Sequence, residues 1–181
     1  MNDKTLRVVM LIYMFALSFI LFYQIIKDRF MKIENVANKL TKNSNKSYGM
    51  RSLSKIAYII WHHSATHSGS AEQFAKYHVE KHDWPGIGYH FVIEKDGTIK
   101  QTNALTTVSY HCPGRNTDGI GVCLVGDFSN SMPTPEQMQS ATWLGREIRK
   151  MVGKNLTSAP HGDFKQTSCP GDKLRNEVYN W

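Results

Sequence analysis

An uncharged run near the N-terminus constrains this chain most strongly. Val8 to Ile26 comprises nineteen residues without a single Asp, Glu, Lys or Arg. A helix rises about 1.5 Å per residue, so this run would span roughly the 30 Å of a bilayer's hydrocarbon core. The flanking sequence FYQIIKDRF offers no small-residue cleavage site. We therefore predict an uncleaved transmembrane anchor over residues 8–26, within an N-terminal segment 1–27; a buried core helix is the alternative.

The next segment, residues 28–55, is basic and is predicted to be a stalk or linker. It carries seven Lys or Arg against two acidic residues, whereas residues 56–181 carry twelve of each sign. Apolar spacing over 30–40 predicts a short helix, lying on anionic lipid or solvated as a stalk, and TKNSNKSYG predicts a flexible linker. The net charge of +7 thus comes from the N-terminal segment and the predicted stalk, residues 1–55. A nucleic-acid-binding domain would carry its basic patch on the fold itself, so no nucleic-acid partner is expected.

Residues 56–181 alternate between strand-like and helix-like patterns. Apolar β-rich runs at 56–61 and 119–125 predict buried strands, and runs at 88–94 and 98–101 flank an Asp-Gly turn typical of a hairpin. Helical spacing covers 70–82, while Thr134 and Pro135 predict the start of a helix that ends near residue 152. A last short helix is expected after residue 172. This order indicates an α/β domain with a central mixed β-sheet flanked by helices.

Three side chains of this domain form a candidate metal site. His161 and Cys169 lie in PHGDFKQTSCPGD, and the strand-like run IAYIIWHH supplies His62. Imidazole nitrogen and thiolate sulfur are donors that zinc prefers, and a catalytic zinc keeps three protein ligands with a fourth position open. His63 points to the opposite face of a strand and is expected to pack there. A slip in strand register would exchange the roles of His62 and His63.

The remaining histidines and cysteines are predicted to have structural roles. His78 and His82 are four residues apart on a helix face but have no acidic residue between them, so both are expected at the surface. His90 follows the hairpin's first residues and is expected to pack in the sheet. Cys123 lies in an apolar run and is expected to be a buried thiol. The sequence does not decide whether Cys112 and Cys123 form a disulfide.

Four motifs within residues 56–181 together resemble one family. IIWHHSAT, GIGYHFVIEKDGTI, IGVCLVGDF and the terminal H-x7-CPGD resemble the zinc-dependent type-2 N-acetylmuramoyl-L-alanine amidases, which include phage amidase endolysins and peptidoglycan recognition proteins. The resemblance implies a Zn2+ cofactor and hydrolysis of the amide between N-acetylmuramic acid and L-alanine in peptidoglycan. A non-catalytic peptidoglycan-binding module is the alternative. A cytoplasmic recycling enzyme is disfavoured, because those enzymes carry Glu at the Cys123 position and Asp at the Cys169 position.

The same resemblance assigns roles to single residues. It implies three zinc ligands, His62, His161 and Cys169. It implies two catalytic residues, Tyr89 in GYHF and Thr167 beside the last ligand. His111 matches a histidine beside the substrate cleft. Two further substrate contacts are expected from position: Lys165 on the ligand loop could attract a muropeptide carboxylate, and Asn116 lies in a polar turn that could line the cleft.

The expected partners are peptidoglycan or muropeptide as substrate and a membrane through the N-terminal helix. We expect a monomeric, single-pass protein of a bacterial inner membrane, encoded by a bacterium or a phage, whose domain acts on the periplasmic, cell-wall side. The flanking charges favour the opposite topology, because Lys4 and Arg7 precede the run while five Lys or Arg follow it within residues 27–42. Either the domain is exported despite this bias, or it stays cytoplasmic until the membrane is breached.

Overall fold

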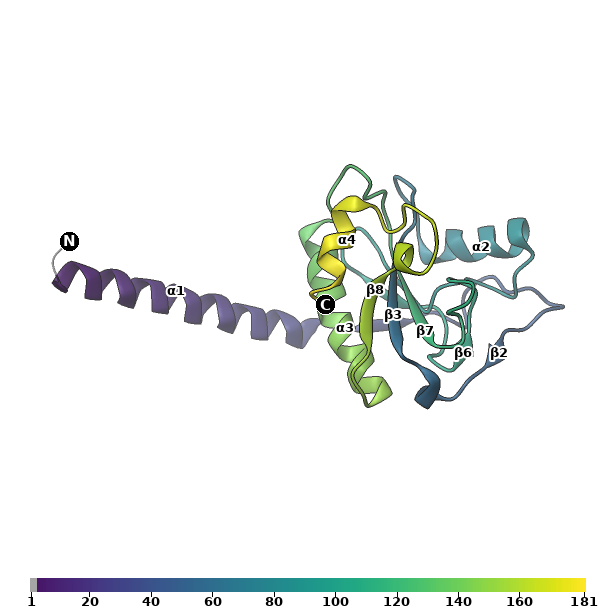
Figure 1. Ribbon diagram of the computed structural model, residues 1–181, viewed down its shortest axis with the longest axis horizontal. Coiled ribbons are helices and arrows are strands. Elements are labelled where there is room, and N and C mark those ends of the chain that lie inside the picture. Colours follow the sequence, from purple (N-terminus) through teal and green to yellow (C-terminus); the bar gives the residue numbers. More distant parts are fainter. Residues whose placement is uncertain (1–2) are drawn as a thin grey trace. The chain divides into compact units, whose positions relative to one another are not determined.

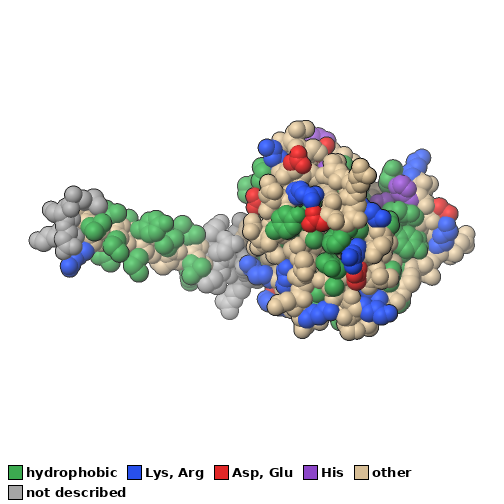
Figure 2. Space-filling model, in the orientation of Figure 1, with side chains coloured by type: hydrophobic (Ala, Val, Ile, Leu, Met, Phe, Trp, Pro, Cys, Tyr) green, Lys and Arg blue, Asp and Glu red, His purple; other side chains and the backbone are tan. Residues whose placement is uncertain are grey.

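The computed structural model describes residues 3–181, which divide into a unit that ends at Lys32 and a second unit, Ile33–Trp181. The described part of the first unit is dominated by one helix, α1 (Asp3–Phe30) (Figure 1). Hydrophobic side chains cover most of its described surface (Figure 2). Its segment Thr5–Phe22 has a mean hydropathy of 2.2, and by length and composition the helix could cross a membrane. The predicted helix is confirmed.

A six-stranded mixed sheet forms the centre of the second unit. Its strands are, in spatial order, β1 (Ile33–Asn35), β5 (Ile99–Gln101), β4 (Phe91–Ile93), β7 (Gly119–Leu124), β3 (Tyr58–His63) and β8 (Thr157–Pro160). The β4–β5 pair is antiparallel and the other neighbours are parallel. A separate antiparallel pair joins β2 (Gly49–Met50) to β6 (Thr107–Val108). The expected hairpin is the β4–β5 pair.

Three α-helices and two short 3-10 helices complete this unit. They are η1 (Leu53–Lys55), α2 (Ala71–His82), α3 (Pro135–Val152), η2 (His161–Asp163) and α4 (Asp172–Val178). Thr134 and Gln137 form a capping box at the start of α3, with Pro135 in the first turn. Gly153, with φ of 76°, ends the helix. The sequence signals therefore predicted the start and the end of α3 correctly.

The two faces of the sheet have different partners. Alternate residues of β3 and β7 face α3 and α4, where Trp61, Val122 and Leu124 join one apolar cluster with Leu144 and Leu174. On the other face α2 packs through Ala71 and Ala75 against Val92 of β4. Because side chains alternate along a strand, the residues between Trp61, Val122 and Leu124 point away from the first cluster. That second set includes His62, Gly121 and Cys123, which form the floor of the site described below.

Residues 33–55 are part of the globular unit, so the predicted stalk over 28–55 and the domain start at residue 56 are wrong. β1 joins the sheet edge parallel to β5, and no helix covers 33–40. Val36 and Leu40 are each only 8% exposed. Buried Arg51 donates to the backbone oxygen of Leu105 at 3.0 Å. The apolar spacing suited a helix, but a short strand and the turn after it bury Val36 and Leu40, while Phe30 at the end of α1 is exposed.

Candidate active site

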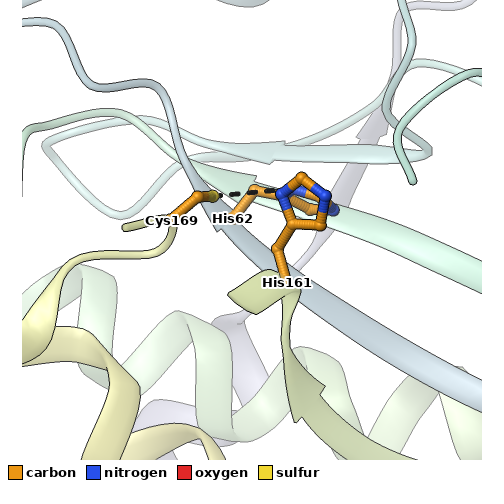
Figure 3. A group of neighbouring side chains, drawn as sticks. All are labelled: His62, His161 and Cys169. Atoms are coloured by element: carbon orange, nitrogen blue, oxygen red, sulfur yellow. Dashed lines mark hydrogen bonds between the residues drawn. The ribbon is translucent and has the colours of Figure 1, made fainter. Parts of the chain in front are cut away.

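Three side chains from separate elements converge at one point. His62 comes from β3, His161 begins η2 directly after β8, and Cys169 precedes α4; the three point toward one another (Figure 3). Their potential ligand atoms all lie within 4.8 Å of one another. Parallel β3 and β8 are neighbours in the sheet, so their carboxyl ends bring His62 and His161 to the same edge. The structure thus gathers all three predicted ligands.

The spacing of the donors fits a tetrahedral metal. Cys169 Sγ lies 3.7 Å from His62 Nδ1. With zinc–sulfur and zinc–nitrogen bonds of about 2.3 and 2.1 Å, tetrahedral geometry would place the two donors ~3.6 Å apart. His161 Nε2 is buried without a hydrogen-bond partner among the described residues. A buried polar atom without a partner is a position where a ligand or ion can bind, so the donor set fits zinc.

The loop that carries two of these donors is closed by its own backbone. The Gly162 N–H donates to the Cys169 carbonyl at 2.9 Å, which joins the two ends of the loop. A Cβ at Gly162 would lie 3.0 Å from the Thr167 carbonyl oxygen and 3.1 Å from the Cys169 carbonyl oxygen, so a larger residue there would press on the backbone of the loop. Asp163 accepts a hydrogen bond from the Tyr179 hydroxyl at 2.9 Å and pairs with Arg175. The C-terminal helix and its last residues thereby hold the ligand loop.

Burial keeps the three donors electrically neutral. It lowers the pKa of His62 well below the usual value, and the nearby His111 and His161 rings lower it further. Burial also lowers the pKa of His161. The pKa of the Cys169 thiol is raised to about 12, chiefly by burial. Both imidazoles therefore offer a lone pair at neutral pH, whereas the thiol has to release a proton before it can bind a cation.

Tyr89 lies beside this group. Its ring centroid is 5.3 Å from that of His62, and the Cys123 thiol lies close enough to its hydroxyl to affect its pKa. Burial, with smaller contributions from Cys123 and Cys169, raises the pKa of Tyr89 well above its usual value. The phenol therefore keeps its proton at neutral pH. It can donate a hydrogen bond next to the metal position.

Residues 52–172 match the family model described as N-acetylmuramoyl-L-alanine amidase, Amidase_2. The chain belongs to this amidase family. The match includes the three converging donors and Tyr89. The predicted architecture, a mixed sheet flanked by helices of the amidase and peptidoglycan-recognition type, is confirmed.

Relatives and solved structures of the amidase family agree with this assignment. The endolysin of Enterobacteria phage K11 is 32% identical over 125 residues, covering 65% of this chain and 82% of the phage protein. Peptidoglycan-recognition protein 1 of Holotrichia diomphalia is 27% identical over 157 residues, covering 76% of this chain and 79% of that protein. The endolysin amidase LysCS of Clostridium intestinale superposes with a TM-score of 0.66 at 30% identity, covering 78% and 88% of the two chains.

The second predicted catalytic residue of the amidase site, Thr167, lies on the ligand loop. Its side chain is exposed, and its Oγ1 accepts a hydrogen bond from the Cys169 N–H at 3.2 Å. The hydroxyl proton is not used in that contact, so Thr167 can donate to a bound group. Lys165, also exposed on this loop, is close enough for its charge to lower the pKa of His161.

The other two predicted substrate contacts of the amidase site face the protein. His111 is only 6% exposed, and its Nδ1 lies 3.2 Å from Nε2 of His62. Asn116 Oδ1 accepts from the backbone N–H of His111 at 3.0 Å and of Cys112 at 2.8 Å. Asn116 therefore holds the turn that carries His111. Their substrate roles stay predictions.

Two residues that the sequence reading assigned to packing do pack. His63 is 6% exposed, and its Nδ1 accepts from the Phe128 N–H at 3.2 Å. His90 is fully buried, and its Nδ1 accepts from the Gly121 N–H at 3.0 Å. Both predictions are confirmed. The register that selects His62 over His63 is fixed by the apolar cluster on the opposite face of the sheet.

One histidine assignment is wrong. His78 is not a surface residue: it is 9% exposed, and its Nδ1 accepts from the Gly88 N–H at 3.1 Å. Its helix-face partner His82 is exposed and stacks on Trp84, with 4.9 Å between ring centroids. The spacing located the helix face, but could not show that the 84–88 loop folds back over part of it.

Some residues of the site were missed by sequence reasoning. Cys123 is a buried free thiol, as predicted, and Cys112 is also a buried free thiol, so no disulfide joins the two. The position of Cys123 directly opposite His62 was not predicted. Gly119 and Gly121 leave room above β7 for the ring of His111. Glycine inside a buried strand often marks a close approach. That signal could have indicated this contact.

Proposed function

We propose that this chain is a zinc-dependent N-acetylmuramoyl-L-alanine amidase that cleaves the amide between N-acetylmuramic acid and L-alanine in peptidoglycan. The convergence of His62, His161 and Cys169 on one point carries the proposal. Membership of the amidase family supports the reaction class. The presence of the thiol supports hydrolysis over binding alone, because recognition without hydrolysis does not require three metal donors.

Zinc held by these side chains would activate water and polarise the scissile carbonyl. The protein's own groups complete the site. The Tyr89 hydroxyl, kept protonated by burial, donates to the oxygen on which negative charge develops. Thr167 donates a second hydrogen bond from the rim of the loop. Loss of one such donor typically costs about 10²–10³ in rate.

Cys123 occupies a position at which the recycling amidases carry a carboxylate proton acceptor. It occupies the β7 position directly opposite His62, where the recycling amidases carry Glu. Burial raises the pKa of this thiol well above its usual value, so it stays protonated at neutral pH. A mechanism that relies on a carboxylate base at this position therefore does not apply to this chain.

The apolar helix α1 supports a further part of the proposal, attachment to a membrane. We infer that α1 anchors the protein in a bacterial inner membrane and that the catalytic unit acts on the cell-wall side. Protease added to spheroplasts tests this topology. Digestion of the catalytic unit in intact spheroplasts supports export, whereas protection until the membrane is permeabilised shows that the unit stays cytoplasmic.

The enzymatic proposal is tested with the purified full chain in detergent micelles and isolated sacculi. We expect release of stem peptides with a free L-alanine amino group, loss of release with a chelator, and recovery on addition of zinc. Cys169→Ser is the matched control, because it removes one donor with little change in volume. A protein that sediments with sacculi but releases no peptide in the presence of zinc is a binding module.

A further inference from the structure

The ring of His111 rests on a floor made by two glycines of β7. Gly119 and Gly121 point to the same face, because side-chain positions alternate along a strand. A Cβ on Gly121 would lie 2.5 Å from Cγ of His111, and one on Gly119 would lie 3.1 Å from Cε1 of the same ring. The ring is 6% exposed. Its position is therefore set by the strand below it.

Both nitrogens of this ring have a partner. His111 Nε2 lies 3.1 Å from the Gly119 carbonyl oxygen, and Nδ1 lies 3.2 Å from Nε2 of His62. A carbonyl oxygen can only accept, so Nε2 of His111 must carry the proton. The neutral ring then has a lone pair at Nδ1, and the proton between the rings must belong to Nε2 of His62.

The proton on Nε2 of His62 determines what its other nitrogen can do. In a neutral imidazole one nitrogen donates and the other has a lone pair. The lone pair of His62 is therefore on Nδ1, the atom that faces Cys169 Sγ at 3.7 Å. This is the form required of a metal ligand. Ligating histidines commonly donate their other N–H to a partner that fixes tautomer and orientation.

Arg51 fixes the far end of this chain of contacts. Its Nη1 donates to the same Gly119 carbonyl at 2.9 Å and to the Asn116 carbonyl at 2.8 Å, and the side chain is 7% exposed. Two donors therefore converge on one carbonyl oxygen. The cation also stands behind His111 and disfavours a second proton on that ring.

We propose that His111 is a positioning residue: it accepts from His62 Nε2–H while donating to the Gly119 carbonyl, and so presents Nδ1 of His62 to the metal. The inference rests on the zinc ligation in the proposed function and extends it to the source of the ligand's tautomer. It replaces the expected substrate contact of His111, because neither ring nitrogen remains free for a substrate.

The tautomer can be observed directly in the metal-free protein. The full chain in detergent micelles, labelled with 15N-histidine and treated with a chelator, gives long-range 1H–15N spectra in which the two neutral tautomers differ. We expect Nε2–H for both His62 and His111 at neutral pH. A spectrum in which His62 carries its proton on Nδ1 overturns the proposal.

Zinc affinity provides an independent readout, measured by competition with a chromophoric chelator. His111→Phe keeps a ring on the glycine floor but cannot accept, and we expect about 10–100-fold weaker zinc binding. His111→Asn places an oxygen acceptor near the Nδ1 position and should recover part of this loss. His78→Phe is the matched control, since it removes another buried histidine that does not contact the ligands.

The outcomes separate this inference from the proposed function. Wild-type zinc affinity in a folded His111→Phe protein, checked by thermal melting of the metal-free form, overturns the positioning role. If His111→Phe does not fold, the wild-type spectrum and the Asn variant decide the matter. The wild type can have the expected tautomer, and His111→Phe the expected weaker zinc binding, while the wild type releases no peptide from sacculi. That result refutes the enzymatic proposal and leaves the positioning role intact.

Discussion

Zinc binding should release one proton, and that proton should come from Cys169. Burial raises the pKa of this thiol to about 12, whereas the pKa values of His62 and His161 are lowered. Near neutral pH the two imidazoles are thus already deprotonated and the thiol is not. Because zinc binds the thiolate, its apparent affinity rises as pH rises. One released proton corresponds to about a tenfold gain per pH unit.

The suitable window is about pH 6 to 6.5, because a zinc-bound water ionises only at a pH of about 7. Chelator competition on the full chain across this window should give a slope of one when the logarithm of the association constant is plotted against pH. Cys169→Asp is the control, because its carboxylate is ionised throughout, and its slope should be close to zero. A flat wild-type profile would show that the thiol is not a ligand, and a slope of two would show that an imidazole is protonated.

Three further perturbations test other parts of the site. Tyr89→Phe should lower peptide release from sacculi by about 10²–10³ with zinc still bound; an unchanged rate would rule out its role as a donor. His78, with a pKa lowered by burial from 6.5 to about 4, stabilises the fold fully above pH 6.5, and this contribution is lost as pH falls. In urea unfolding of the metal-free chain, the free energy of unfolding of the wild type minus that of His78→Asn should therefore fall by about 2 kcal/mol from pH 6.5 to 5. A difference that stays constant with pH would contradict a neutral buried ring. Gly121→Ala places a Cβ 2.5 Å from Cγ of His111. It should lower the free energy of unfolding by about 1–3 kcal/mol and also weaken zinc binding. A variant with the melting temperature and zinc affinity of the wild type would refute the close approach.

Local patterns predicted most elements of the catalytic unit. The Asp-Gly turn gave the β4–β5 hairpin, and the capping signals at Thr134 gave α3. Alternation along β3 separated His62 from His63, because the apolar partners of Trp61 fix which residues face the opposite side. These features depend on residues near one another in sequence, or on a two-residue period.

The parts that were not predicted depend on distant pairings. β1 belongs to the sheet because it pairs with β5, whose residues come 66 positions later, and nothing in its three residues identifies that partner. Arg51 is buried because it donates to backbone carbonyls, which carry no residue-type signal. The role of His111 depends on the same kind of contact. The sequence placed it near the site, and only the structure shows which groups its two nitrogens meet.

The central claim is that two imidazoles and one thiolate hold a zinc ion, and zinc K-edge X-ray absorption on the zinc-loaded full chain tests it most directly. The account predicts one sulfur at about 2.3 Å and two imidazole nitrogens at about 2.0–2.1 Å, completed by a light oxygen ligand. Cys169→Ser should lose the sulfur shell. A spectrum of the wild-type protein fitted by nitrogen and oxygen alone, or a folded protein that retains no zinc, would contradict the account.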